Sequence, residues 1–359
     1  MGNYVSAWYH SDRKDKARSD AIDRQIQEDS RRFRKEYQIL LLGASESGKS
    51  TIVKQMKITH QNGFTKNELM MFHPTIYRNT LDSAQAIVRQ MHNMNVECVT
   101  FANWTFAKRI VEYRVESTPD FVFSTDIARA IHELWQDPII PKVMDCSSQF
   151  HLMDSASYFF TEVLRIGTPD YIQTENDVLR AQAKTTGITS MWFNAGLLSI
   201  HIIDVGIQLS QRRKWIHYFE HVPSIIFCAA LSEYNQELLE GKNQNRMQES
   251  LILFESVVNS RWFLDTFIIL FLNKIDVFKK KLLKAPIEKY FPEYTGGTDV
   301  NKAAKYILWK FLQANRARLS VYPHLMQATD TTDTTLFRLV FDAVKETILQ
   351  NSFKDSRIL

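Results

Sequence analysis

The sequence is poor in cysteine and has no long apolar segment. Only three cysteines, Cys98, Cys146 and Cys228, occur among 359 residues, and they form neither a C-x-x-C motif nor an even disulfide framework. Such sparse cysteine is typical of a reducing compartment. No stretch approaches the ~20 apolar residues of a membrane-spanning helix, and no cleavable signal peptide is recognisable. We therefore expect a cytosolic globular protein.

A dominant basic tract is also missing. The formal net charge is +4 and 23% of the residues are charged, so nucleic acid is not an expected partner. The ten histidines are scattered, which favours packed or solvated roles over metal ligation. No internal repeat or low-complexity tract is visible. With 45% hydrophobic residues, the chain can bury two modest cores.

The most specific motif is a phosphate-binding loop at Gly43–Thr51, which fits G-x-x-x-x-G-K-[ST]. It follows an apolar run at 37–42, typical of a buried strand, and precedes a helical pattern at 52–58. Backbone N–H groups at such a helix N-terminus bind phosphate. Lys49 is predicted to reach the β and γ oxygens, and the Ser50 hydroxyl to ligate Mg²⁺. The alternative, a plain glycine turn, is disfavoured by this context.

A second apolar run, at 267–272, ends in Asn273-Lys274-Ile275-Asp276. A carboxylate at this point matches the N1–H and N2 donors of guanine, whereas adenine would leave Asp276 unpaired. The stem of Lys274 is predicted to lie along the base, and Asn273 to tie the loops together. The site is therefore expected to select guanine nucleotides.

A third apolar run, at 197–204, is followed by Val205-Gly206-Ile207-Gln208. At its end, Asp204 is predicted to hold Mg²⁺ through water. Gln208 is predicted to orient the water that attacks the γ-phosphate.

With these residues in view, the chain resembles the α subunits of heterotrimeric G proteins nearly from end to end. It resembles a divergent member, nearest the inhibitory type, and its length excludes a small Ras-like protein. The segments whose sequences match that family are Ser47–Lys57, Lys184–Ile188, Asn245–Met247, Phe271–Lys274 and Ala328–Thr331.

The expected fold is an α/β Ras-like P-loop GTPase domain with an inserted all-helical domain and an N-terminal amphipathic helix. Helical periodicity at 80–91, 127–135 and 158–164, without strand alternation, favours the insertion. Apolar runs at 39–42, 197–204, 225–231 and 267–272 alternate with helices, which favours a mostly parallel sheet. A last helix is expected at 334–350. The expected domains are 1–36 (a myristoylated helix), 37–61 with 177–359 (the GTPase domain) and 62–176 (the helical domain).

The resemblance implies a guanine nucleotide site with Mg²⁺ as cofactor and GTP or GDP as the bound nucleotide. The implied metal ligands are Ser50 and Thr185, with Asp204 acting through water. The implied catalytic residue is Gln208, with Gln182 at the arginine-finger position. The implied nucleotide contacts are Gly43, Glu46, Ser47, Gly48, Lys49, Ser50, Thr51, Asp154, Ser155, Leu179, Arg180, Ala181, Gln182, Asp204, Val205, Gly206, Ile207, Gln208, Asn273, Lys274, Ile275, Asp276 and Ala328.

Several residues depart from the family pattern inside these motifs. Ser45 stands where the family has glycine and is expected to crowd the γ-phosphate. Gln182 replaces the arginine finger, and a neutral amide cannot offset the charge that develops in the transition state. Ile207 replaces a glycine, and Leu209 replaces an arginine that pairs with a glutamate, here Glu249. The base loop reads Met326-Gln327-Ala328-Thr329, which keeps the expected contact of Ala328 with the base.

Two functions follow from this combination. The first is a signalling GTPase that transduces signals from seven-helix receptors to effectors and hydrolyses GTP slowly. The second is a guanine-nucleotide-dependent, membrane-anchored binding module with little or no GTPase activity. Gln208, Thr185 and Ser50 favour the first, which we take as the main hypothesis.

The N-terminus carries a lipidation motif. Met1–Ser6 fits M-G-x-x-x-[ST], which makes Gly2 a myristoylation candidate. One myristoyl chain binds membranes only marginally, and Asn3 stands where related chains offer a cysteine for palmitate. Basic residues at 13–18 can supply the second signal, although a solvated helix face explains them equally well. The expected location is the cytoplasmic face of the plasma membrane.

The resemblance also implies protein partners. The charged helix expected at 19–35 has a narrow apolar seam and is expected to dock on the βγ dimer. The tail at 354–359 matches the receptor-binding segment, and the switch regions are expected to bind an effector.

Overall fold

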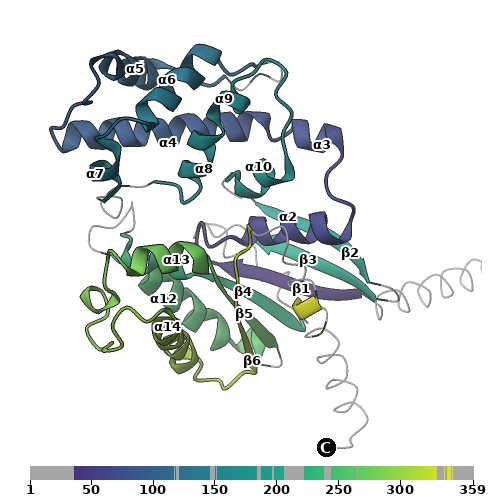
Figure 1. The fold of residues 1–359 in the computed structure, drawn as a ribbon. Helices are drawn as coiled ribbons and strands as arrows, with labels where there is room; N and C mark the ends of the chain where they lie inside the picture. The colour runs from purple at the N-terminus through teal and green to yellow at the C-terminus, as the bar shows by residue number, and fades with distance from the viewer. Residues whose placement is uncertain are drawn as a thin grey trace, which may run out of the picture.

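The computed structural model describes residues 36–116, 118, 121–145, 150, 152–183, 187–195, 198–205, 222–237, 244–264, 266–329, 335, 338–340 and 342. These residues form a six-stranded sheet with helices packed on it. A layer of further helices lies beyond one end of the strands (Figure 1).

The sheet has the strand order β2-β3-β1-β4-β5-β6. Its strands are β1 (Glu36–Gly43), β2 (Ile188–Ala195), β3 (Leu198–Val205), β4 (Ser224–Ala230), β5 (Phe267–Asn273) and β6 (Val321–Leu325). All neighbouring pairs are parallel except β2 and β3, which form an antiparallel pair at one edge. The predicted α/β fold with a mostly parallel sheet is therefore confirmed.

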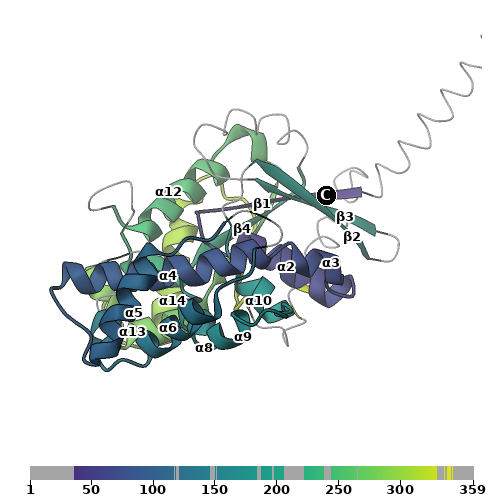
Figure 2. The same ribbon diagram turned by 90° about the horizontal axis from the view of Figure 1, so that it is seen from above.

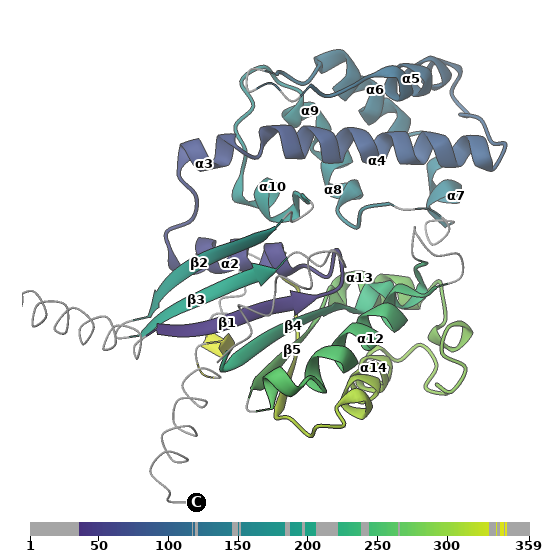
Figure 3. The same ribbon diagram turned by 180° about the vertical axis from the view of Figure 1, so that it is seen from behind.

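Helices cover both faces of the sheet. Leu40 and Leu42 of β1 belong to a core that includes α12 (Arg246–Val258), α13 (Ile275–Leu282) and α14 (Val300–Ala314). The intervening residues Ile39 and Leu41 face the opposite core, which contains Ile52 and Met56 of α2 (Lys49–His60). Alternate residues of β1 thus enter different cores, as a strand covered on both faces requires. Figure 3 shows α12 and α14 in front of the strands.

Between α2 and β2 the described chain is entirely helical. Its helices are α3 (Lys66–Met70), α4 (His73–Asn93), α5 (Phe101–Glu112), α6 (Thr125–Trp135), α7 (Ile140–Asp145), α8 (Ala156–Thr161), α9 (Val163–Ile166) and α10 (Glu175–Arg180). Helices α4 to α9 share a core of their own. The 21-residue α4 runs the length of this layer, as the view from above shows (Figure 2). Three short 3-10 helices complete the described structure: η2 (Leu231–Asn235), η3 (Arg261–Phe263) and η4 (Ile287–Lys289).

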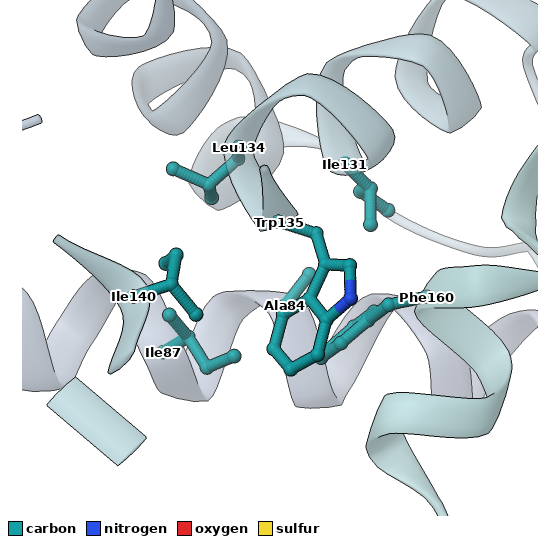
Figure 4. A pocket seen from close by; sticks show the side chains of 7 residues that line it. All are labelled: Ala84, Ile87, Ile131, Leu134, Trp135, Ile140 and Phe160. Atoms are coloured by element: carbon teal, nitrogen blue, oxygen red, sulfur yellow. The ribbon is translucent and has the colours of Figure 1, made fainter. Parts of the chain in front are cut away.

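The helical core contains a small apolar hollow, about large enough for a single water molecule, that is partly open to solvent (Figure 4). Its lining comes from α4, α6, α7 and α8 and consists of Ala84, Ile87, Ile131, Leu134, Trp135, Ile140 and Phe160. None of these side chains carries a charge, so the hollow offers nothing that binds phosphate or metal. It is a small apolar gap within the helical core.

A buried carboxylate fixes α10, the helix that leads back toward the sheet. Asp177 accepts hydrogen bonds from the hydroxyls of Tyr158 (2.8 Å) and Tyr171 (3.0 Å) and from both terminal nitrogens of Arg165 (2.7 and 3.0 Å). Burial raises the pKa of this carboxyl, but Arg165 and the other donors outweigh it and hold the pKa below its usual value. A fully satisfied buried carboxylate of this kind anchors the start of α10 to α8 and α9.

Some expected boundaries were wrong. The strand expected at 225–231 ends at Ala230, and Leu231 opens the 3-10 helix η2. The single helix expected at 158–164 is interrupted at Glu162, which separates α8 from α9. The edge strands β2 and β6 had not been predicted. The N-terminal helix and most of the helix expected at 334–350 lie outside the described residues. Among the described helices, none is both long and apolar enough to cross a membrane.

Candidate nucleotide-binding site

The phosphate-binding loop joins the end of β1 to the start of α2 and requires its glycines. A side chain at Gly43 would place its Cβ 2.1 Å from the carbonyl oxygen of Cys228 on β4. Gly48 has φ of 99°, and a Cβ there would lie 2.1 Å from the Asn273 amide nitrogen. Both positions therefore combine a left-handed backbone with close packing, which only glycine tolerates. Close packing thus holds the loop against β4 and Asn273 at the α2 N-terminus.

Lys49 and Ser50, the first residues of α2, approach the end of β3. The Lys49 ammonium donates to the carbonyl oxygens of Gly43 (3.0 Å) and Ala44 (2.9 Å), inside the loop. The Ser50 hydroxyl donates to Oδ2 of Asp204 at 3.2 Å. Burial lowers the pKa of Lys49, and the Asp204 carboxylate partly offsets this. Burial also raises the pKa of Asp204, against the effect of Lys49. Lys49 and Asp204 thus place a cation and an anion beside the phosphate loop.

The donor set around Asp204 fits Mg²⁺. The other oxygen of Asp204, Oδ1, is buried and accepts no hydrogen bond from the described residues. A hydroxyl beside such a carboxylate oxygen is the hard oxygen chemistry that Mg²⁺ prefers. Within the described ranges, no group of three or more His, Cys, Asp or Glu side chains is placed to hold a metal. A metal at this site would therefore rely on hydroxyl, water and phosphate oxygens.

Asn273 joins three loops. Its amide nitrogen donates to the Ser47 carbonyl oxygen in the phosphate loop at 3.0 Å. Its Oδ1 accepts the backbone N–H of Lys274 (2.8 Å) and of Ala328 (3.1 Å). The phosphate loop and the two loops expected to bind the base thus share one buried side chain. Asp276 lies close by in the first turn of α13, with Ile275 before it.

Lys274 also reaches the helical layer. Its ammonium contacts Oδ2 of Asp154 at 2.8 Å, and Lys281 approaches the other oxygen of the same carboxylate at 3.7 Å. Burial raises the pKa of Asp154, but the two lysines and Arg246 reverse this and bring it to about 2. Asp154 is therefore charged at neutral pH and links the loop before α8, with Ser155, to the loop expected to bind the base.

Four of the predicted nucleotide contacts, at 179–182, lie together at the end of α10. The carbonyl of Leu179 accepts from Thr51 at 3.4 Å, and that of Ala181 accepts from Lys54 at 2.7 Å. Arg180 turns away from α2, because its guanidinium bonds Oδ1 of Asn176 (2.8 Å) and lies 4.4 Å from the Tyr158 ring centre.

Of the other expected site residues, only Val205 lies within the part of the chain that the structure describes, where it is the buried last residue of β3. Beyond it, Gly206, Ile207, Gln208 and Leu209 lie outside the described residues, as do Thr185, Gly2 and the C-terminal tail. Glu249, the expected partner of position 209, lies exposed in the first turn of α12.

The structure adds Arg246, to which sequence reasoning had assigned no role. Its guanidinium donates to the Ser45 carbonyl oxygen (2.8 Å) and to the Glu46 carboxylate (3.1 Å). It also lies 2.9 Å from the buried carboxylate of Glu233, whose pKa is raised by burial in spite of this arginine. From the start of α12, Arg246 thus holds the part of the phosphate loop at Ser45 and Glu46. Arg246 lies in the segment Asn245–Met247, which matches the family, but nothing local in the sequence indicates its contacts with the phosphate loop.

Comparison with known proteins agrees with this geometry. The family model described as "G-protein alpha subunit" matches residues 16–348. The chain belongs to the G-protein alpha subunit family. Members of this family bind guanine nucleotides, hydrolyse GTP, and generally work with βγ dimers, receptors and effectors at the inner face of the membrane.

The relatives of this α subunit include fungal and animal proteins. It is 63% identical over 344 residues to "Guanine nucleotide-binding protein subunit alpha" of Cryptococcus neoformans. That match covers 96% of this chain and 79% of the relative. It is 61% identical to the alpha-3 subunit of Mycosarcoma maydis, with both chains fully covered. It is 43% identical to the G(o) subunit alpha of Locusta migratoria, with 99% of each chain covered.

Proposed function

We propose that this α subunit is a GTP/GDP switch that requires Mg²⁺ and hydrolyses GTP slowly. The observation that carries the proposal is the convergence of Lys49, Ser50 and Asp204 on one loop, which Asn273 ties to the base side. Ser50 and Thr185 would ligate the metal, and Asp204 would hold it through water. When bound, Mg²⁺ neutralises charge on the β and γ phosphates.

Slow hydrolysis follows from the residues around the γ-phosphate. Gln208 retains the amide that orients the attacking water. Gln182 has no charge to stabilise the transition state, and Ser45 adds a side chain where the loop nears the γ-phosphate. Arg180 does not replace the missing charge, because it is bound to Asn176 and Tyr158.

Single-turnover hydrolysis of preloaded GTP tests this function. We expect a measurable but slow rate in the wild-type protein. Gln208→Leu should lower that rate by at least about tenfold, a loss of roughly 1.4 kcal/mol of transition-state stabilisation, while GTP binding stays intact. Equal rates in the two proteins would contradict the switch and support a nucleotide-dependent binding module.

The division of the chain and its partners belong to the same proposal. We infer a GTPase domain at 37–61 and 177–359 and a helical domain at 62–176. The N-terminal helix would dock on the βγ dimer, the tail would bind a seven-helix receptor, and the switch regions would bind an effector. The ion pairs of Asp154 support a nucleotide site that is closed by both domains.

Membrane attachment is expected to depend on Gly2. One myristoyl chain is marginal alone, so basic residues at 13–18 would add about 1 kcal/mol each on an anionic leaflet. Gly2→Ala should move the protein to the soluble fraction, whereas Asn3→Ala, which keeps the motif, should not. Wild-type attachment should weaken in about 0.5 M salt, where the screening length is roughly 4 Å. Gly2→Ala protein that stays on membranes in this salt would reveal a different anchor.

A further inference from the structure

The backbone of Gln182 is paired with one side chain of the helical layer. The Gln182 N–H donates to Oδ1 of Asn79 at 2.7 Å, and Nδ2 of Asn79 donates to the Gln182 carbonyl at 2.9 Å. The carboxamide has both an accepting oxygen and a donating NH₂ group, so it can bond the N–H and the carbonyl of one residue at once. These two hydrogen bonds fix both the position and the orientation of the Gln182 backbone.

The residues just before Gln182 are held from the opposite side. Lys54 of α2 donates to the carbonyl oxygens of Val178 (3.0 Å) and Ala181 (2.7 Å). Ala181 is itself buried. The segment 178–182 is therefore clamped between α2, which packs on the sheet, and α4, which belongs to the helical layer.

We propose that Asn79 is a positioning residue for position 182, because it fixes the backbone from which the side chain at the arginine-finger position extends. The inference rests on the proposed function. Asn79 acts through residue 182, whose side chain is expected to face the γ-phosphate. Misplacement by about 1 Å can cost 10²-fold in rate. Because Asn79 lies on α4 and Lys54 on α2, correct placement of residue 182 depends on both layers.

The native Gln182 carries no charge, so its exact placement affects the rate little. An arginine at the same position must reach the γ-phosphate, so its placement matters. Asn79→Ala should therefore slow single-turnover hydrolysis by about tenfold or more in the Gln182→Arg background. In the wild-type background the same substitution should change the rate less than about twofold. A general loss of stability would slow both backgrounds equally.

Binding measurements separate positioning from structural damage. Aluminium fluoride with GDP mimics the transition state, so its half-saturating concentration in the Gln182→Arg background should rise by the same factor as the rate falls. The affinity for GDP alone should stay within about twofold. Asn79→Asp keeps an acceptor for the Gln182 N–H but places a second carboxylate oxygen against the Gln182 carbonyl oxygen, so its effect should be at least as large as that of Asn79→Ala. Asn93→Ala, on the same helix about 21 Å away, is the matched control and should have no effect.

The outcomes are decisive. A loss confined to the Gln182→Arg background, with matching weakening of aluminium fluoride binding, supports the positioning role. Equal losses in both backgrounds, no loss in either, or no gain from Gln182→Arg would overturn it. Failure of the wild-type protein to bind GDP or GTP would instead overturn the proposed function, and this is measured before any variant is compared.

Discussion

GTP and GDP are expected to displace a bound guanine nucleotide about 10⁴-fold better than ATP. The reason is Asp276, which follows β5 in the first turn of α13 and can accept both the N1–H and the N2 amino group of guanine. Adenine offers neither donor there, and a site built on such hydrogen bonds rejects the unmatched base by this order of magnitude. A displacement titration with GTP and ATP measures the ratio directly.

Asp276→Asn is the matched test of this explanation. The amide presents an N–H₂ donor where the carboxylate accepts, so guanine should bind about 10²-fold more weakly through the loss of charge-assisted bonds. Xanthine carries an oxygen at C2 in place of the amino group, so the variant should bind xanthosine triphosphate better than the wild type does. Equal competition by ATP and GTP for the wild-type site would contradict the role of Asp276.

The parts of this fold that were predictable are those with a local physical signature. The strand β5 is apolar throughout because a central parallel strand is buried on both faces. Its end is marked by the polar residues that begin the base loop. The phosphate loop was equally evident, because Gly43 and Gly48 are required by close packing and by positive φ. Such features constrain the sequence at the position where they occur.

The edge strands were missed for the opposite reason. β6 has a partner on one side only and is half-exposed, and it contains Pro323 and His324 within five residues. A proline is tolerated in an edge strand because no N–H is needed on the open side. The break between α8 and α9 was equally hidden. Phe159, Phe160 and Val163 are all buried, so the apolar period continues across Glu162.

The contacts of Arg246 and Asn79 show a different limit. Arg246 reaches Ser45 and Glu46 across about 200 positions of sequence, and Asn79 reaches Gln182 across 103. Asn79 belongs to no recognised motif, and the family-matching segment that contains Arg246 does not indicate what its side chain contacts. The packing of α12 on the sheet brings Arg246 to the site, and the packing of the helical layer against the sheet brings Asn79 there.

Gln182→Arg is expected to speed single-turnover GTP hydrolysis by more than about tenfold. A guanidinium stabilises the charge that develops on the γ-phosphate, and the arginine finger is known in Gα subunits and related GTPases generally to contribute about 10³–10⁵. The gain here is expected to fall below that range, because the proposed crowding of the γ-phosphate by Ser45 would remain, as would the replacements at positions 207 and 209 of the second switch. Rates of preloaded GTP hydrolysis measure the gain, and Gln136→Arg, which adds the same charge at an exposed position after α6, is the control.

Ser45→Gly, added to Gln182→Arg, should raise the rate of GTP hydrolysis further by removing the side chain expected to crowd the γ-phosphate. With Ser45→Gly added, the introduced arginine can approach a γ-phosphate that is no longer displaced, so the double variant should exceed the product of the two single gains. Neighbouring residues that act on one group are non-additive in this way. A wild-type rate near the ~10⁻² s⁻¹ known for Gα subunits with their arginine in place would contradict the explanation. So would an unchanged rate in Gln182→Arg with intact GTP binding, since another residue would then be supplying the charge. Because Arg180 is held by Asn176 and Tyr158, we expect no such substitute among the neighbours of Gln182 on α10, and the missing charge is then the main cause of slow turnover.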